Sequence, residues 1–414
     1  MRRRTTVVLV VVAIALGGVV AYGVTIGTGG GELRTLWVSD TERPVLGNHH
    51  APTAGRVDGH PVVYAPISGN YSSAQCALVA LNATTGARLW NYQVPATNCT
   101  IHSVADPAIA DLDGDGTEEV LAETTENLIH GFDALTGRQR FSYPLASYGY
   151  TQPIVADFTG DEDEEVIGVD TSGTVVVRDA NGTTVWRRTV PGYVNAQPAL
   201  ADFTGDGTRE LAVGFGAKAL VVFEPDGTVA WRRSPPSDGT ITWMVTGQTD
   251  ADPAVEVVVG TVTGQVVTVD GRTGRVEWQR DLGDFAAVHA FGDGDDDGRP
   301  EVYAVARDGK LRSLDAATGA TEWTTTLDTG DIQVVPPPSM GDVDGDGNPE
   351  LVAVTNGGAV SVVDPADGSV RGTYERNVPI WEHPRIADTD GDGVDEIYVM
   401  YGDGRVVALS AAGR

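Results

Sequence analysis

Lysine and cysteine are almost missing from this sequence of 414 residues. Lys218 and Lys310 are the only lysines, and the 28 basic residues face 58 acidic ones. A formal net charge of −30 repels the phosphates of nucleic acids and anionic lipid surfaces, so we expect no nucleic-acid partner. The acidic excess has two compatible explanations: metal ligation in particular loops, and hydration of a protein from a high-salt, halophilic source.

Cys76 and Cys99 are the only cysteines, without a C-x-x-C spacing or an adjacent pair. This scarcity excludes the common cysteine-based zinc and redox motifs. Outside the cytosol the two thiols can form one disulfide, and two free thiols are the alternative. No Ser/His/Asp set, zinc-ligand spacing or phosphate-binding loop is recognisable either. The sequence therefore favours a protein that is not an enzyme.

One long apolar run stands near the beginning of the chain. Three arginines at positions 2–4 precede residues 7–26, which carry no charge and match the length of a membrane-spanning helix. Basic residues stay on the cytoplasmic side. We therefore expect a cytoplasmic arginine cluster and a transmembrane signal-anchor helix over residues 1–27, then a linker over residues 28–31. A cleaved signal peptide is the alternative, but its apolar core is shorter.

This orientation places the rest of the chain on the extracellular side of the cell membrane, as a single-pass protein. Four N-x-[ST] sequons suit that location, because such acceptors are used in secreted proteins. They begin at Asn70, Asn82, Asn98 and Asn181.

Residues 32–414 consist of repeats. Acidic loops recur at intervals of 45–57 residues, the length of four short strands with their turns. Many β-branched residues and 52 glycines leave no room for long helices. We therefore expect an all-β, eight-bladed β-propeller with four-stranded blades. The loops begin near Ala54 and at Asp111, Asp157, Asp202, Gln248, Asp293, Asp342 and Asp388, the copies at Ala54 and Gln248 being degenerate.

An aromatic residue after a turn in each repeat gives an independent count. The eighth aromatic is missing at the C-terminal end, where the sequence stops at Arg414 just after the strand Arg405–Ser410, but Trp37 in the strand Glu32–Val38 can supply it. The first strand would then complete the last blade and close the ring, which leaves no exposed sheet edge between the ends. Two four-bladed domains are the alternative, and the interlocked ends argue against them. The other seven aromatics are Trp90, Phe141, Trp186, Trp231, Trp278, Trp323 and Tyr374.

The acidic loops have the spacing of a site for a hard cation. In the loop 111–119, carboxylates occupy positions 1, 3, 5 and 9, and a glycine at position 6 permits a tight turn. Ca²⁺ takes about 6–8 oxygen ligands, which such a loop can wrap around the ion. An EF-hand is excluded, because it needs an acid at position 12, where this loop has Ala122 in an expected strand.

An acid at position 9 followed directly by a strand resembles the FG-GAP (VCBS-type) calcium loops of integrin α-subunit propellers. The resemblance implies several structural Ca²⁺ sites. Threonine replaces the second acid in two loops, Gln248 replaces the first acid of the loop with Asp250, Asp252 and Glu256, and the copy near Ala54 keeps only Asp58. The candidate ligands are Asp111, Asp113, Asp115 and Glu119; Asp157, Asp161 and Glu165; Asp202, Asp206 and Glu210; Asp293, Asp295, Asp297 and Glu301; Asp342, Asp344, Asp346 and Glu350; and Asp388, Asp390, Asp392 and Glu396.

The turn and aromatic of each repeat, as in 80–90 with Trp90, resemble the tryptophan-docking repeats of eight-bladed pyrroloquinoline quinone (PQQ) dehydrogenases. The same repeat occurs in the lipoprotein that helps to assemble outer-membrane β-barrels. It implies a way of packing blades rather than a cofactor. The adjacent cysteine pair common in the dehydrogenases is absent, and we do not expect PQQ to bind.

A second candidate site lies at the mouth of the propeller channel, the usual place for a ligand. The residue five positions before each loop start leads into the innermost strand, and six of the eight are polar or aromatic, with His102 and His289 nearby. Solvation of a wet channel is the plainer explanation. The six candidates are His49, Asp106, Gln152, Gln197, Trp243 and His383.

The sequence thus predicts a membrane-anchored, calcium-stabilised propeller that binds a protein or glycan at the cell surface. The alternatives are a surface enzyme, either a quinoprotein dehydrogenase or a polysaccharide lyase, and an assembly factor for envelope proteins.

Overall fold

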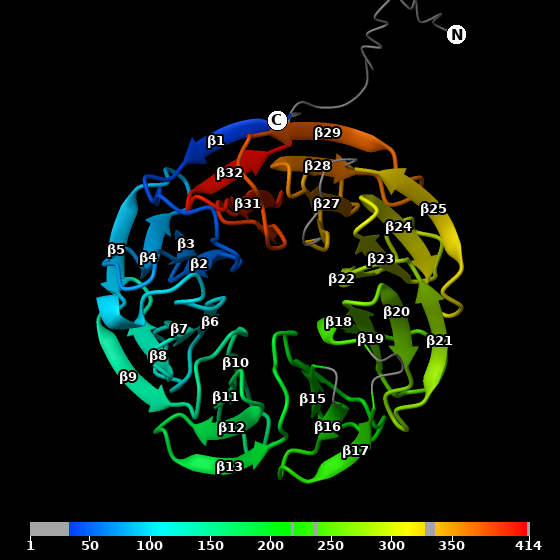
Figure 1. The fold of residues 1–414 in the computed structure, drawn as a ribbon, viewed down its shortest axis with the longest axis horizontal. Helices are drawn as coiled ribbons and strands as arrows, with labels where there is room; N and C mark the ends of the chain where they lie inside the picture. Colours follow the sequence, from blue (N-terminus) through cyan, green and yellow to red (C-terminus); the bar gives the residue numbers. More distant parts are fainter. Residues whose placement is uncertain (1–32, 217–218, 235–238, 328–335, 412–414) are drawn as a thin grey trace, which may run out of the picture. The chain divides into compact units, whose positions relative to one another are not determined.

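The computed structural model describes residues 33–216, 219–234, 239–327 and 336–411 (Figure 1). The expected arginine cluster, transmembrane helix and linker lie outside these ranges. Across the described ranges, the one helical segment is the 3₁₀ turn η1 (Ala96–Asn98), and no helix is long and apolar enough to cross a membrane.

Eight antiparallel four-stranded sheets surround a common axis, which confirms the eight-bladed propeller (Figure 1). In each blade the chain begins at the innermost strand. The innermost strands are β2 (Thr53–Val57), β6 (Ala108–Ala110), β10 (Ile154–Ala156), β14 (Ala199–Ala201), β18 (Ile241–Gly247), β22 (Ala286–Gly292), β26 (Ser339–Gly341) and β30 (Arg385–Ala387). The second strands are β3 (His60–Ile67), β7 (Glu119–Thr124), β11 (Glu165–Val169), β15 (Glu210–Phe215), β19 (Glu256–Thr261), β23 (Glu301–Ala306), β27 (Glu350–Val354) and β31 (Glu396–Met400).

The third and outermost strands complete the blades, which are numbered 1 to 8 from β2. The third strands are β4 (Ala77–Asn82), β8 (Leu128–Asp133), β12 (Thr174–Asp179), β16 (Ala219–Phe223), β20 (Gln265–Val269), β24 (Lys310–Asp315), β28 (Ala359–Val363) and β32 (Val406–Ser410). The outermost strands of blades 1 to 7 are β5 (Arg88–Gln93), β9 (Gln139–Pro144), β13 (Thr184–Thr189), β17 (Val229–Arg233), β21 (Val276–Asp281), β25 (Thr321–Thr326) and β29 (Val370–Glu375).

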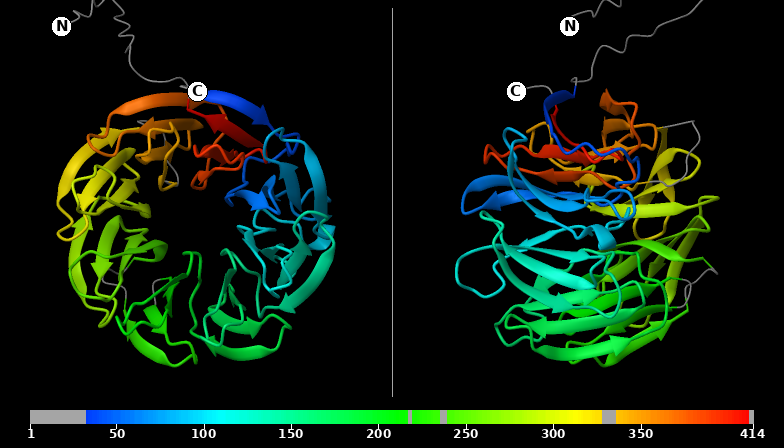
Figure 2. Two further views of the ribbon diagram at one scale, coloured as in Figure 1. Left: turned by 180° about the vertical axis from the view of Figure 1, so that it is seen from behind. Right: turned by 60° about the vertical axis from the view of Figure 1, so that its left-hand side comes forward.

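The outermost strand of blade 8 is β1 (Arg34–Val38), which pairs antiparallel with β32, Arg34 opposite Ser410. Figure 2 shows from behind the blue first strand beside the red last strand. The expected closure by the two ends of the chain is confirmed, and the alternative of two separate four-bladed domains is wrong.

Burial explains the sequence pattern of each strand type. Seven of the eight second strands are buried along their whole length, as in Glu256–Thr261, because neighbouring blades cover both faces, whereas β3 begins with the exposed His60. The outermost strands are mostly exposed, as in Val229–Arg233, where only Trp231 is buried, and in Arg88–Gln93 half-buried residues alternate with exposed ones. Eight hydrophobic clusters fill the interfaces, each with residues from two neighbouring blades.

The predicted aromatics join one blade to the next. In six blades a tryptophan of the outermost strand donates its indole N–H to a backbone carbonyl in the turn between the third and fourth strands of the next blade. The N···O distances are 2.5–2.9 Å, and the pairs are Trp37 with Ala83, Trp90 with Ala134, Trp186 with Pro225, Trp231 with Gly271, Trp278 with Ala316 and Trp323 with Pro365.

Blade 2 departs from the expected pattern. The side chain of Phe141 has no N–H or O–H to donate. The contact is made two residues later, where the Tyr143 hydroxyl donates to Ala180 O at 2.7 Å. The Phe141 ring stacks on Tyr143 with 4.4 Å between centroids. The docking residue of this blade is therefore Tyr143 and not the predicted Phe141.

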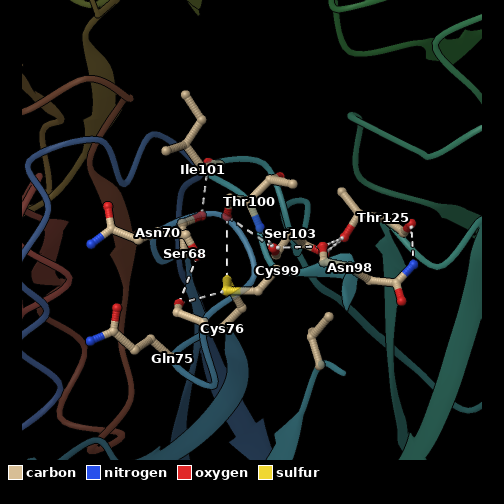
Figure 3. The surroundings of a disulfide bond; sticks show 12 residues. Ser68, Asn70, Gln75, Cys76, Asn98, Cys99, Thr100, Ile101, Ser103 and Thr125 are labelled. Carbon is tan, nitrogen blue, oxygen red and sulfur yellow. Dashed lines mark hydrogen bonds between the residues drawn. A yellow bond between two sulfur atoms is a disulfide. The ribbon is translucent and has the colours of Figure 1, made fainter. Parts of the chain in front are cut away.

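Cys76 and Cys99 form a disulfide, with Cα atoms 5.4 Å apart (Figure 3). The bond ties the residue after η1 to the residue that precedes β4. Beyond it, the Ser68 hydroxyl donates to Ile101 O at 2.9 Å. The sequence left the bridge open because the 23-residue separation by itself says nothing about proximity. The structure settles the choice in favour of the bridge.

Candidate functional site

A cavity of about 670 Å³ opens at the centre of the ring, and all six predicted channel-mouth residues line it: His49, Asp106, Gln152, Gln197, Trp243 and His383. The cavity has the size of a small-molecule or peptide side-chain site. Residues that the sequence did not single out also line it, among them His50, Tyr150, Trp381, Glu382 and Arg385.

Two of the six candidates are engaged between blades. The Gln197 side chain accepts from Gln152 N–H at 2.7 Å and donates to Gln152 O at 3.0 Å. The Gln152 amide donates to Pro107 O at 2.5 Å. Because their polar atoms satisfy backbone groups, these glutamines close the inner wall of the ring.

Histidines gather on one side of the cavity. His49 Nε2 lies 2.5 Å from His102 Nδ1, and His50 Nδ1 lies 3.0 Å from Asp106 Oδ1. Burial, together with neighbouring histidines, lowers the pKa of His49 to about 3 and that of His102 to about 4. Tyr150 packs against this group, its ring centroid 4.8 Å from that of His50.

A second group lies nearby on the segment that leads into β30. His383 Nδ1 contacts Glu382 Oε1 at 3.1 Å, and the His383 ring stacks on His289 at 4.1 Å. Burial lowers the pKa of His383 to about 4 and raises that of Glu382, which the Asp106 carboxylate raises further. Burial therefore favours the neutral forms of His383 and Glu382.

The acidic loops share one geometry. In the five loops with a glycine at position 6, the first aspartate accepts from the N–H of that glycine, as Asp293 does from Gly298 at 2.9 Å. The glutamate at position 9 is the first residue of the second strand and is buried; Glu301 accepts from Gly294 N–H at 3.0 Å. One carboxylate oxygen from each of Asp293, Asp295, Asp297 and Glu301 lies within 4.8 Å of the others.

Burial raises the pKa of three of these glutamates, Glu256, Glu301 and Glu350, to about 7, with further increases from neighbouring carboxylates. It raises the pKa of Glu119 to about 6. A carboxylate held in this way is poorly compensated, and a cation bound among the acids would lower its pKa again.

The copies differ in ways that the sequence did not reveal. In blade 2 the guanidinium of Arg140 lies 2.8 Å from Asp115, 3.3 Å from Asp113 and 3.6 Å from Glu119. The acids of this loop, which has all four carboxylates, therefore already have a cationic side chain as their partner. In blades 3 and 4 the threonine that replaces the second acid donates to the buried glutamate, for example Thr204 Oγ1 to Glu210 at 3.2 Å.

The two degenerate copies differ from one another. In blade 5 the loop around Asp250 and Glu256 gains Glu277 from the outermost strand, and these three acids lie within 4.8 Å. In blade 1 the loop is replaced by a two-residue hairpin turn in which Asp58 and Gly59 have φ angles of 46° and 74°. Only Asp58 remains there, as the sequence indicated.

The missed residues carried weak sequence signals. His50 follows His49 and Glu382 precedes His383, so each adjoined a chosen position. Glu277 and Arg140 directly precede the aromatics that the sequence predicted, Trp278 and Phe141, and this register would have identified them. Arg385 stands in an innermost strand as an unremarkable basic residue.

A family model described as outer membrane protein assembly factor BamB matches residues 34–204, 156–293 and 217–414. No curated protein matches the sequence. The structure of BamB from Moraxella catarrhalis is 17% identical and superposes with a TM-score of 0.62, covering 91% of this chain and 97% of that chain.

Two further structures share the fold. The V. cholerae biofilm matrix protein Bap1 is 14% identical with a TM-score of 0.71, over 92% of this chain and 91% of that chain. The computationally designed protein Ika8 is 15% identical with a TM-score of 0.61, over 89% and 99%. At these identities the superpositions show the fold alone.

The family match confirms the resemblance to the tryptophan-docking propeller repeats, whereas the FG-GAP resemblance of the acidic loops remains a prediction. The chain from β1 to its C-terminal end belongs to the family of the outer membrane protein assembly factor BamB.

Proposed function

We propose that this chain is a membrane-tethered scaffold that binds a protein on the extracytoplasmic side, as a BamB-like assembly factor would. The observation that carries the proposal is the family match, which extends over all eight blades. The disulfide supports the location, because such bonds persist in oxidising compartments. The anionic composition supports a protein or glycan partner over nucleic acid.

The cavity mouth is the part of the ring best suited to a partner. Trp243 and Trp381 line it beside polar groups, and aromatic residues with a polar surround are typical of binding surfaces. Leu46, also in the lining, is 58% exposed. A partner segment that covered Leu46 would bury apolar area that is now in contact with water.

A photo-cross-linking amino acid at Leu46 tests the proposal in the native membrane. We expect one discrete protein adduct, identified by mass spectrometry, from that position. The matched control is Val276, which is 47% exposed on the outermost strand β21. No adduct at Leu46, or equal adducts at both positions, would contradict a scaffold that binds through its mouth.

We further propose that several acidic loops hold Ca²⁺ and stiffen the ring. Two observations support a fit: the four convergent carboxylates of blade 6, and the buried Glu256 Oε1 of blade 5, which has no hydrogen-bond partner. The ion would be held by Asp293, Asp295, Asp297 and Glu301 in blade 6 and would neutralise their mutual repulsion. The Arg140 contact makes the blade 2 loop a poorer candidate.

Removing calcium should lower the melting temperature, because an ion that binds only the folded chain adds about 2.7 kcal/mol per site at 100 times its Kd. We expect EGTA to lower the melting temperature at constant ionic strength, and Ca²⁺ to restore it. Asp295→Asn should weaken the response more than Asp113→Asn, whose loop has Arg140. A melt unchanged by EGTA would contradict the calcium proposal.

A further inference from the structure

Three histidines outside the acidic loops converge beside the cavity, and two of them, His49 and His50, line it. His49 and His50 precede β2, and His102 follows the disulfide in sequence. One ring nitrogen of each lies within 4.8 Å of the others. We propose that His49, His50 and His102 bind a late first-row divalent metal ion of the Zn²⁺ type, with an open coordination position toward the cavity.

The contacts of His50 select the nitrogen that it would offer. Asp106 Oδ1 accepts from Ala51 N–H at 3.0 Å and faces His50 Nδ1 at 3.0 Å. A carboxylate oxygen accepts, so His50 Nδ1 carries the proton and Nε2 keeps its lone pair. Nε2 has no hydrogen-bond partner although His50 is 99% buried, its relative exposure being 1%. An oriented imidazole whose second nitrogen bonds a carboxylate is the usual arrangement of a metal ligand.

His49 is oriented in the same way. Its Nδ1 lies 2.6 Å from Gly47 O, and because a carbonyl can only accept, the proton stays on Nδ1. The Nε2 lone pair therefore points at His102 Nδ1, 2.5 Å away. Without a metal, His102 must donate its own proton in this contact. With a metal, both nitrogens become ligands.

The distances require a small adjustment. Zn–N bonds of about 2.0–2.1 Å in a tetrahedron place ligand nitrogens roughly 3.4 Å apart. The His49–His102 contact must therefore widen by about 1 Å, and His50 Nε2 must come within the same radius. Three imidazoles leave a fourth position of the tetrahedron, and since His49 and His50 line the cavity, a water or an anionic oxygen of a ligand could occupy it.

The two segments that carry the histidines are fixed to one another. A Cβ atom at Gly47 would lie 3.3 Å from the Ile101 side chain, so the backbone at Gly47 packs directly against that residue. The Cys76–Cys99 disulfide and the hydrogen bond from Ser68 to Ile101 fix the segment that carries His102 (Figure 3). The ligands would thus be preorganised by long-range bonds.

Metal titration of the full-length chain in detergent tests the site. Excess Ca²⁺ is present throughout, so that the acidic loops are not available to the titrant. We expect one equivalent of Co²⁺ to bind with the visible absorption bands of a tetrahedral nitrogen site, and Zn²⁺ to displace it. His102→Gln should lower the affinity by more than about 100-fold, and Asp106→Asn by about 10–100-fold.

The matched control is His60→Gln, because His60 is exposed at the start of β3 and is separated along the chain from His49 and His50 by β2. That variant should bind Co²⁺ like the wild type. The wild-type titration is informative even if a variant fails to fold. Absence of the Co²⁺ bands, or of Zn²⁺ binding at micromolar concentration, would overturn the proposal. Equal affinities in the His102→Gln and His60→Gln variants would also overturn it.

Discussion

At the scale of single residues, the propeller contains two neighbouring buried carboxylates that accept different numbers of hydrogen bonds. Asp170 accepts hydrogen bonds from the backbone N–H groups of Ala146, Ser147, Ser172 and Thr174. Glu123, fully buried in β7, accepts from Val169 N–H at 3.2 Å through one oxygen, while the other has no partner. Burial, and then the Asp170 charge, raise the pKa of Glu123 well above its ordinary value.

A raised carboxyl pKa makes stability depend on pH. The protonated Glu123 is the stable buried form, so its contribution is complete below the unfolded pKa and is lost as the pH rises through the folded pKa. Glu123→Gln imitates the protonated group. Relative to the wild type, we expect this variant to raise the free energy of unfolding more at pH 8 than at pH 5. Urea titrations at the two pH values measure this, with the exposed Glu162→Gln as control. Equal pH dependence in both variants would contradict it.

At the scale of elements, the repeated contact is a tryptophan of one blade packed against a turn glycine of the next blade. Each of the six docking tryptophans covers the turn glycine of the next blade, where a Cβ atom would meet the ring at 2.5–2.7 Å; in blade 3 the pair is Trp186 and Gly227, at 2.7 Å. The glycine is required twice, for its φ of +75° and for the space that the indole fills. This explains why both residues recur at the same register.

Gly227→Ala and Gly160→Ala separate these two requirements. Their φ angles are 75° and 77°, so both pay about 1–2 kcal/mol for a left-handed alanine, but only at Gly227 does the new Cβ meet the indole. We expect Gly227→Ala to cost about 1–3 kcal/mol more, as overpacking does. Chemical denaturation measures the difference, and equal losses would show that the indole moves freely.

At the scale of the whole molecule, the ring is closed by a single strand. β1 pairs only with β32, and Trp37 docks on blade 1 through the 2.6 Å bond to Ala83 O. Every blade then has two neighbours, so the eight interfacial clusters are continuous around the ring. Closure also covers the edge of β32, which would otherwise be available for pairing with another chain.

Trp37→Ala should weaken this closure. We expect a loss of about 3–5 kcal/mol and release of β1, seen as rapid trypsin cleavage after Arg34. Trp231→Ala removes an equivalent docking indole between two other blades. We expect it to destabilise the fold while leaving Arg34 protected from trypsin. If both variants are cleaved at Arg34 at the same rate, β1 is not held by Trp37.

Much of this architecture could be predicted because its signals are local and repeated. The acidic loops, the glycine turns and the aromatics recur in one register, and the alternation in strands such as Arg88–Gln93, where Trp90 and Tyr92 are half-buried between exposed residues, reports burial directly. The closure followed from a count, since the aromatic missing at one end stood at the other as Trp37. The carboxylates of each loop lie within nine residues, so their convergence needs only a turn.

The sequence by itself therefore determined the blade count, the closure and the candidate loops of this protein. Tertiary structure alone decided which distant groups meet: the Cys76–Cys99 bond, Arg140 and Glu277 over their loops, and His102 beside His49. The physical reason is that short-range patterns record backbone geometry and burial, whereas a contact between segments 23 to 53 residues apart depends on how whole strands stack.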